Sequence, residues 1–112
     1  MTGAAPASEP AAGRREQIAH AIETLLRTPR GPAGARRATG VDYLDPEGRP
    51  RTALGSAAVE ASAHQALLRD EPRVELDAVT AHFDGDMLID IRVAYRDRGD
   101  ASQHEVTVFY AG

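Results

Sequence analysis

A strict two-residue alternation between Met87 and Tyr95 constrains the fold of this chain more than any other sequence feature. Large apolar side chains occupy every second position of this segment, namely Met87, Ile89, Ile91, Val93 and Tyr95. A period of two places alternate side chains on opposite faces of an extended chain, whereas a helix would scatter them around its axis. We therefore expect a β-strand whose odd-numbered side chains face a hydrophobic core.

Two further alternating segments flank this strand. In residues 74–83 the apolar positions slip by one residue near Ala78, which predicts a β-bulge. Asp84-Gly85 follows, and these residue types favour a hairpin because they tolerate the positive φ of a tight turn. After a polar turn around Gly99, the last segment alternates Val106, Val108 and Tyr110 with Glu105, Thr107 and Phe109. The pattern predicts a three-stranded antiparallel β-meander.

The preceding half of the chain has a helical period. From about Arg14 to Arg27 the apolar residues form one helical stripe, made of Ile18, Ala21, Ile22, Leu25 and Leu26. A second helix is expected to run from Ser56, as the N-cap residue, to about Arg69. Its predicted apolar face consists of Val59, Ala63, Ala66 and Leu67. The mostly small side chains of this second face suit close packing against a sheet or a neighbouring helix, in this chain or in another.

The remaining segments predict a loop and a tail. Residues 29–50 are rich in proline and glycine and predict a long loop anchored by Val41, Tyr43 and Leu44. Residues 1–12 are almost all small or proline, so we expect a flexible tail before a single domain at 13–112. The expected fold class is α+β, with two helices followed by a three-stranded antiparallel β-meander in one compact domain.

The composition excludes several classes of function. The chain has 112 residues and no cysteine, so a disulfide, a thiol nucleophile and a Cys-ligated zinc are unavailable. The formal charge of −4 disfavours nucleic-acid binding. The chain has only five aromatic residues, which disfavours both base stacking and an aromatic-lined ligand pocket. No stretch approaches the ~18 apolar residues of a membrane span, and we recognise no signal peptide, so we expect a cytoplasmic product without membrane insertion.

The charges are unevenly distributed along the chain. Between Arg27 and Arg51 there are six arginines and three acids, whereas Asp70 to Asp90 contains seven acids and only Arg73. Two interpretations stay open. The two regions are either solvated surfaces or complementary patches through which subunits dock.

Motifs for catalysis or metal binding are absent from the sequence. It contains no phosphate-binding loop, metalloprotease motif or serine-hydrolase motif, and its four histidines lie on different predicted elements. Asp84, Asp86 and Asp90 surround Gly85 without the glycine position and closing glutamate of a calcium loop. We expect no catalytic residue, no metal and no cofactor.

Two joints of the chain carry a more distinctive pattern. The second predicted helix passes into the first strand through Glu71-Pro72-Arg73, and the first helix ends in Leu25-Leu26-Arg27-Thr28-Pro29-Arg30-Gly31. Together these joints resemble the small baseplate wedge protein of contractile phage tails, phage gene product twenty-five. Its relatives include the TssE subunit of type VI secretion and the wedge subunits of extracellular contractile injection systems. The resemblance covers about residues 14–110.

The loop after the first helix departs from this family. Relatives continue with a Glu-Arg pair and then a Phe-Gly, whereas this chain has Pro32-Ala33 and then Thr39-Gly40. The contacts that this loop makes in relatives are therefore not carried over to this chain. The label "lysozyme" that is sometimes attached to the family finds no support in these residues either, because nothing predicts the desolvated pocket that a catalytic acid needs.

The resemblance implies a structural baseplate component of a contractile injection system, and not an enzyme. Its implied partners are larger baseplate wedge proteins, the sheath protein, and inner tube or hub proteins as further candidates. Several copies would stand in a ring, assembled in the cytoplasm into a phage-tail-like particle. Glu71, Pro72 and Arg73 would contact a larger partner, and the last strand, with Thr107 and Phe109 on it, would form the edge where the sheath begins.

Alternatives remain for the joint and for the whole chain. Glu71 and Arg73 could form a local ion pair at a helix end. Taken as exposed, such a pair contributes only ~0–1 kcal/mol to folding, so we expect it to serve binding more than stability. The alternative for the chain is a small cystatin-like α+β enzyme or ligand-binding domain, in which His82 and Asp90 would be an acid–base pair across the hairpin. A free-standing adaptor is a third possibility.

Overall fold

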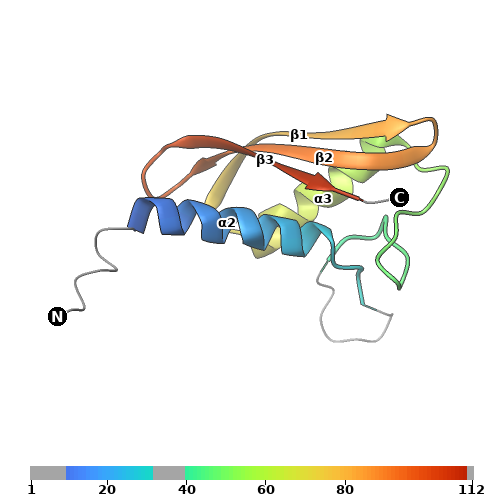
Figure 1. Cartoon of the computed structure of the whole chain (residues 1–112), viewed down its shortest axis with the longest axis horizontal. Coiled ribbons are helices and arrows are strands. Elements are labelled where there is room, and N and C mark those ends of the chain that lie inside the picture. Colours follow the sequence, from blue (N-terminus) through green and yellow to red (C-terminus); the bar gives the residue numbers. More distant parts are fainter. Residues whose placement is uncertain (1–9, 32–39, 111–112) are drawn as a thin grey trace.

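The computed structural model describes residues 10–31 and 40–110. Its elements follow in the order α2 (Pro10–Leu26), α3 (Ser56–Asp70), β1 (Val74–Asp84), β2 (Met87–Asp97) and β3 (Gln103–Phe109). The three strands form one antiparallel sheet in the order β1-β2-β3 (Figure 1). The predicted α+β class and the predicted meander are confirmed. Most of the predicted tail, residues 1–9, lies outside the described residues.

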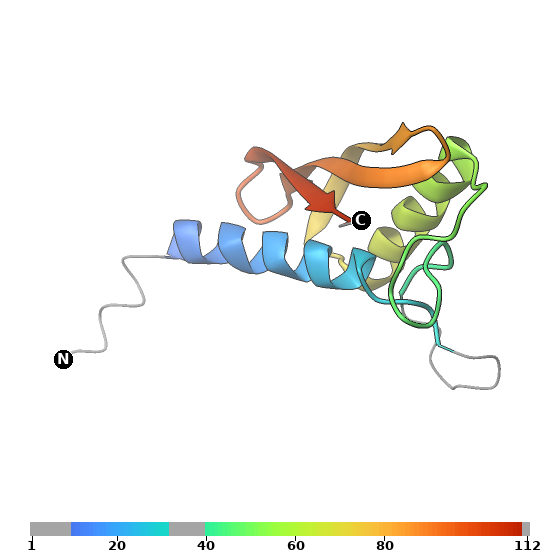
Figure 2. The ribbon, with the colours of Figure 1, turned by 45° about the vertical axis from the view of Figure 1, so that its right-hand side comes forward.

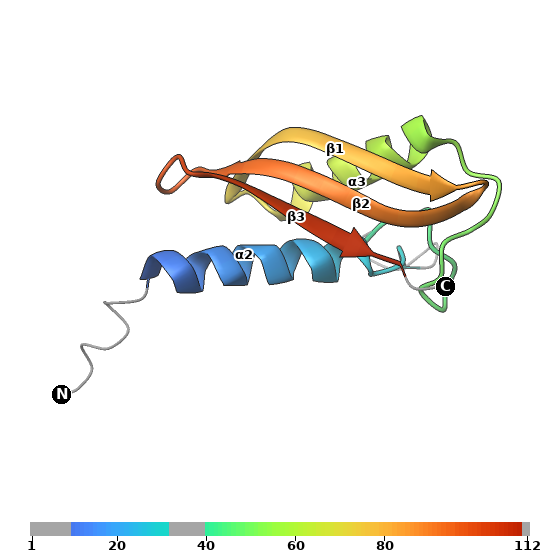
Figure 3. The same cartoon turned by 45° about the horizontal axis from the view of Figure 1, so that its top comes forward.

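Both helices lie on one face of the sheet, and no helix within residues 10–31 and 40–110 covers the other face (Figures 1 and 2). Helix α3 packs mainly against β1, while α2 runs beside β3 (Figure 3). The predicted helix faces are largely confirmed. Ile18, Ile22, Leu25 and Leu26 of α2 and Val59, Ala63, Ala66 and Leu67 of α3 are buried, and Ala21 is half-buried. Because one face of the sheet collects all this apolar surface, the opposite face and the two edges remain for contacts with other molecules.

The helix ends differ in part from the sequence prediction. Helix α2 begins at Pro10, inside the segment predicted as tail, and proline suits a first helical turn because that position needs no amide hydrogen. It ends at Leu26, close to the predicted Arg27, and the Thr28 hydroxyl donates a hydrogen bond to the Thr24 carbonyl at 2.6 Å. The prediction of Ser56 as N-cap residue was wrong. Gly55 holds that position with extended backbone and makes no side-chain cap.

The sheet has one bulge that the sequence predicted and one that it did not. The register shifts between Leu76 and Ala78, as expected, and shifts again between His82 and Phe83, where Ile89 is the extra residue of β2. The second shift inverts the start of β2. Leu88 is therefore buried, whereas Met87 and Ile89 are 41% and 39% exposed, so the predicted core positions of these two residues were wrong.

The segment from Gly40 to Leu54 folds against the C-terminal end of α2 (Figure 2). Its predicted anchors Val41, Tyr43 and Leu44 are buried, which confirms them. Gly40 has a φ of 101°, and a side chain there would collide with the Thr28 and Pro29 carbonyls, so only glycine permits this close approach.

Candidate interaction surfaces

Strand β3 is an edge strand whose outward backbone groups can be assigned from its register. The Asp97 amide donates to the Ser102 carbonyl, and the Tyr110 amide donates to the Ile89 carbonyl, both at 2.9 Å. No register shift separates these two bonds. In an antiparallel pair the bonding direction alternates, so the even-numbered residues of β3 bond to β2. The amides and carbonyls of Gln103, Glu105, Thr107 and Phe109 consequently point away from the sheet.

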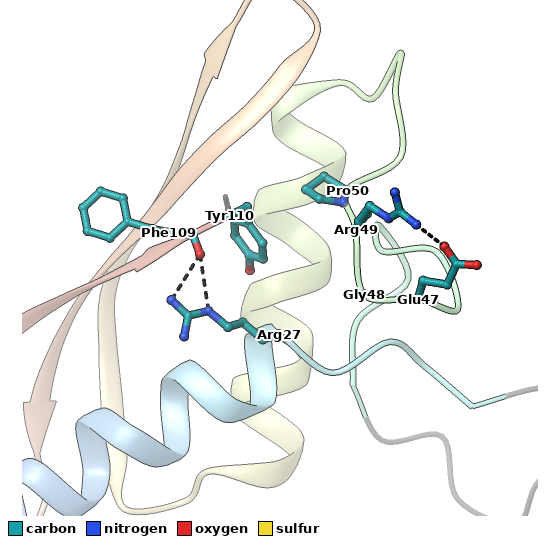
Figure 4. A pocket seen from close by; sticks show the side chains of 7 residues that line it. All are labelled: Arg27, Glu47, Gly48, Arg49, Pro50, Phe109 and Tyr110. Atoms are coloured by element: carbon teal, nitrogen blue, oxygen red, sulfur yellow. Dashed lines mark hydrogen bonds and ion pairs between the residues drawn. The ribbon is translucent and has the colours of Figure 1, made fainter. Parts of the chain in front are cut away.

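One of these outward groups is occupied by Arg27, the residue that follows α2. The Arg27 guanidinium donates two hydrogen bonds to the Phe109 carbonyl, from Nε at 3.3 Å and from Nη2 at 3.1 Å (Figure 4). Within residues 10–31 and 40–110, the outward groups of Gln103, Glu105 and Thr107 have no hydrogen-bond partner. The β3 edge is therefore open over residues 103–107 and closed at 109.

The end of β3 is fastened to the core beneath it. The Tyr110 hydroxyl donates to the Leu26 carbonyl at 2.6 Å and lies 2.8 Å from the Tyr43 hydroxyl, and the two rings meet edge to face. Burial raises the pKa of both phenols, so both stay neutral hydrogen-bonding groups. Phe109 points the other way and is 60% exposed, as the alternation predicted.

Strand β1 forms the opposite edge and is closed differently. The Glu60 carboxylate, on α3, accepts a hydrogen bond from the Ala81 amide at 2.9 Å. Strand β1 also takes part in both register shifts of the sheet. A bulged strand with a carboxylate on its outer amide is a poor template for another strand.

A groove of about 480 Å³ lies beside the end of β3 (Figure 4). Arg27, Phe109 and Tyr110 form one wall, and residues 47–50 form the other. An ion pair between Arg49 and Glu47 lies on the far wall, so both signs of charge are present there. The groove continues the β3 edge toward the segment at 47–50.

The Glu71-Pro72-Arg73 joint forms a compact turn between α3 and β1. The Arg73 guanidinium donates to both carboxylate oxygens of Glu71, at 2.7 and 2.8 Å, and these bonds raise the pKa of Arg73. Glu71 is only 5% exposed, so the premise of an exposed ion pair was wrong for this carboxylate. Pro72 is exposed, and Leu68, on the last turn of α3, is 54% exposed. The joint thus combines a structural ion pair with an exposed apolar surface.

A second bidentate ion pair ties α2 to the turn before β3. The Arg14 guanidinium donates to both oxygens of Asp97, at 2.8 and 3.0 Å. Gly99 lies so close to this ion pair that a side chain at this position would crowd both the guanidinium and the carboxylate. The hydrogen bonds from Arg14, and a further one from the Gly99 amide, lower the pKa of Asp97 although burial opposes them.

The uncovered face of the sheet holds the pair that an enzyme would need. His82 Nδ1 lies 2.8 Å from Asp90 Oδ1, so the predicted contact across the hairpin is confirmed. The neighbouring depression of about 270 Å³ is lined by Ala78, Thr80, His82, Arg92, Ala94 and Glu105. It lies on an open sheet face, and the His82 side chain is 41% exposed, which does not provide the desolvation that acid–base catalysis favours.

The comparisons with known proteins agree with this geometry. A family model described as "Baseplate wedge protein gp25" matches residues 12–101. The chain belongs to the baseplate wedge protein gp25 family. It is also similar to Baseplate protein W of Escherichia phage P2, with 33% identity over 86 residues that cover 75% of each chain. A crystal structure from Geobacter sulfurreducens matches with a TM-score of 0.65 and 26% identity, over 88% of this chain and 92% of that one.

Membership of the gp25 family confirms the resemblance found in the sequence and gives the chain a structural role in a phage-tail baseplate. The Geobacter sulfurreducens protein is described by name as a tail lysozyme, and this description applies to that protein and is not carried over to this chain. Among the described residues, no helix is long and apolar enough to cross a membrane. In the same part of the chain, no three histidine or acidic side chains come together as a metal site would require.

Sequence reasoning missed two residues that shape the edges of this gp25 family member. Arg27 and Glu60 each cap one outward backbone group on an edge strand, although they lie 82 and 21 residues from their partners in sequence. Arg27 belongs to the segment at the end of the first helix that carries the family resemblance, but that pattern does not indicate a contact with the last strand, and Glu60 belongs to no recognisable motif. Their roles depend on which helix packs beside which strand, and one sequence does not contain that information.

Proposed function

We propose that this chain binds larger baseplate wedge proteins at its Glu71-Pro72-Arg73 joint and provides, with β3, the edge on which the sheath begins. The observation that carries the proposal is the asymmetry of the sheet. Strand β3 is regular and open over residues 103–107, while β1 is bulged and capped by Glu60. An open, regular edge favours strand addition by another chain.

The joint favours a protein contact because of its exposed surface. Leu68 is 54% exposed and lies four residues before the exposed Pro72. Glu71 is a poor residue for testing this contact, because removing a buried, paired carboxylate also destabilises the fold. The double variant Leu68→Ala with Pro72→Ala leaves the ion pair in place. We expect it to stay folded and to lose recovery of the larger baseplate partner in co-purification. Unchanged recovery contradicts this part of the proposal.

The sheath role is tested with proline at outward positions of β3. Thr107 and Phe109 both direct their amides away from β2, so proline at either position removes an outward donor and leaves the bonds to β2. We expect both variants to fold by circular dichroism and to join the baseplate. Thr107→Pro interrupts the open part of β3 and should support no sheath in electron micrographs, while Phe109→Pro lies at the end that Arg27 closes and is its matched control. Normal-length sheaths with Thr107→Pro would remove the sheath role from the account.

The proposal also includes several copies in a ring, assembled in the cytoplasm into a phage-tail-like particle. Inner tube or hub proteins are further candidate partners. A ring requires heterologous contacts, in which two different surfaces of one subunit meet its neighbours or partners. The joint and the β3 edge are two different surfaces of this kind.

A further inference from the structure

This inference rests on the proposed role of the β3 edge and concerns which strand docks there. The outward groups of Gln103, Glu105 and Thr107 are open, whereas the Phe109 carbonyl already accepts two hydrogen bonds from Arg27. The Arg27 guanidinium occupies the place that an amide of an added strand would take. A strand that pairs along β3 therefore ends before Phe109.

Glu105 lies at the centre of the open part of the β3 edge, residues 103–107, which we call the open window. Its side chain shares the uncovered face with Ala94, its partner in β2, and is exposed. Within the residues that the structure describes, Glu105 makes no ion pair. A residue of an added strand directly opposite would place its Cβ roughly 5 Å away, where opposite charges attract and like charges repel. The window thus favours a basic residue opposite Glu105.

A second copy of this chain fits the window poorly. Two-fold antiparallel pairing of residues 103–107 with themselves would place the two Glu105 carboxylates opposite each other. Pairing of β3 with the β1 edge of another copy would meet the bulge between Leu76 and Ala78 and the Glu60 cap. The charge and the backbone together point to a different protein as the occupant.

We propose that the β3 edge takes an extended segment of about five residues from another protein, with lysine or arginine opposite Glu105, and that Arg27 fixes where this segment ends. Its flanking residues are β-branched, because they continue the apolar layer that Val106 and Val108 begin on the helix side of β3. Charge at Glu105 sets which strand binds, and Arg27 sets its register.

The charge part is tested with acetylated, amidated peptides at millimolar concentration against the full chain labelled with ¹⁵N. The probe is Thr-Val-Lys-Val-Thr, and its matched control has glutamate at the centre. We expect the lysine probe to slow hydrogen exchange of the Glu105 and Thr107 amides and to bind about tenfold tighter than the control. In Glu105→Lys the preference should reverse. Equal binding of both peptides to both proteins, or no protection with either peptide, would overturn the inference.

The register part is tested with a probe lengthened by one Val-Thr pair, so that it can reach Phe109. In the natural chain the Phe109 amide should stay unprotected, and in Arg27→Ala its exchange should slow by about tenfold. Arg15→Ala is the matched control, because Arg15 is an exposed arginine on α2, the helix that Arg27 directly follows. Protection of Phe109 in the natural chain would show that Arg27 sets no end. A different outcome is that the Thr107 amide is protected in the protein alone, and that this protection rises with protein concentration as a dimer forms in ultracentrifugation. That outcome would identify a second copy of the chain as the occupant and would overturn the proposal.

These outcomes separate the inference from the proposed function. If both peptides bind equally while Thr107→Pro builds no sheath, the edge role stands and the selectivity of Glu105 is wrong. If the lysine probe binds as expected while Thr107→Pro builds normal sheaths, the edge recognises such strands but the sheath does not use it.

Discussion

The two edges of this sheet differ in how they are kept from pairing. On β1 the protection is distributed along the strand, because β1 has a bulge between Leu76 and Ala78, its pairing with β2 shifts again after His82, and Glu60 covers the Ala81 amide. On β3 the protection is concentrated at one end, where Arg27 holds the Phe109 carbonyl, and the rest is straight and open. Exposed edges risk aggregation, so an edge left open in an otherwise guarded sheet is the better candidate for a specific partner.

The same comparison shows where β3 gains its rigidity. Both ends of the open window are tied to α2, through Arg14 and Asp97 before the strand and through Tyr110 and Leu26 after it. Among the described residues, no side chain makes such a tie to the outer backbone groups in the middle of this segment. A strand held at both ends presents a pre-formed template, which reduces the conformational entropy lost when a partner binds.

The largest effect is expected where β3 enters the core. Tyr110→Ala removes a buried ring and its hydrogen bond to the Leu26 carbonyl, and should lower the free energy of unfolding by about 3–4 kcal/mol in urea titrations. Phe109→Ala, at the adjacent but 60% exposed position, should change it by less than about 0.5 kcal/mol. If both variants lose a similar free energy of unfolding, Tyr110 is not a buried residue and Phe109 an exposed one, and this description of the end of β3 is wrong.

An intermediate effect is expected at the other end of the window. Asp97→Asn removes a charge-assisted, bidentate interaction with Arg14 and should lower the free energy of unfolding by about 2 kcal/mol at neutral pH. The pKa of Asp97 is lowered in the folded state, so its contribution is complete above the ordinary carboxyl pKa of 3.8 and is lost as pH falls through the lower folded-state value. Stability measured from pH 5 to 2 should therefore fall less steeply in Asp97→Asn than in the natural chain, and parallel curves would contradict this.

A smaller effect is expected when the β1 edge is uncovered. Glu60→Ala leaves the Ala81 amide without its partner and should lower the free energy of unfolding by about 1 kcal/mol. Because the β1 edge is then uncovered, we also expect self-association that grows with protein concentration in ultracentrifugation. Glu16→Ala, an exposed acid on α2, is the matched control. If Glu60→Ala stays monomeric and fully stable, Glu60 does not guard the edge and the two edges are more alike than we describe.

The sequence predicted those features that depend on local pattern. The buried faces of both helices, the bulge near Ala78 and the outward Phe109 all follow from spacing along the chain. The second bulge was missed because Met87 and Ile89 continue the alternation without interruption, and only pairing with Phe83 and His82 shows that one residue is extra. Residue pattern fixes the face of a regular strand but cannot reveal a register shift imposed by its neighbour.

The candidate site was predicted only in part for a similar reason. The motif at residues 71–73 identified the joint, but burial of Glu71 depends on how α3 meets the sheet, and no local pattern specifies that. The β3 edge was predicted from its place at the end of the meander. Its limits at Arg27 and the closure of β1 by Glu60 required the packed structure.

Hydrogen exchange in the assembled particle distinguishes a sheath that begins on β3 from one that begins on β1. The outward amides of Glu105 and Thr107 on β3 can be compared with that of Val79, which by the same alternation points outward on β1. Between the isolated chain and the baseplate with its sheath, we expect exchange of the Glu105 and Thr107 amides to slow by at least about tenfold while exchange of the Val79 amide is unchanged. Slower exchange at Val79 with no change at Glu105 and Thr107 would show that the sheath begins on the β1 edge and would contradict the account.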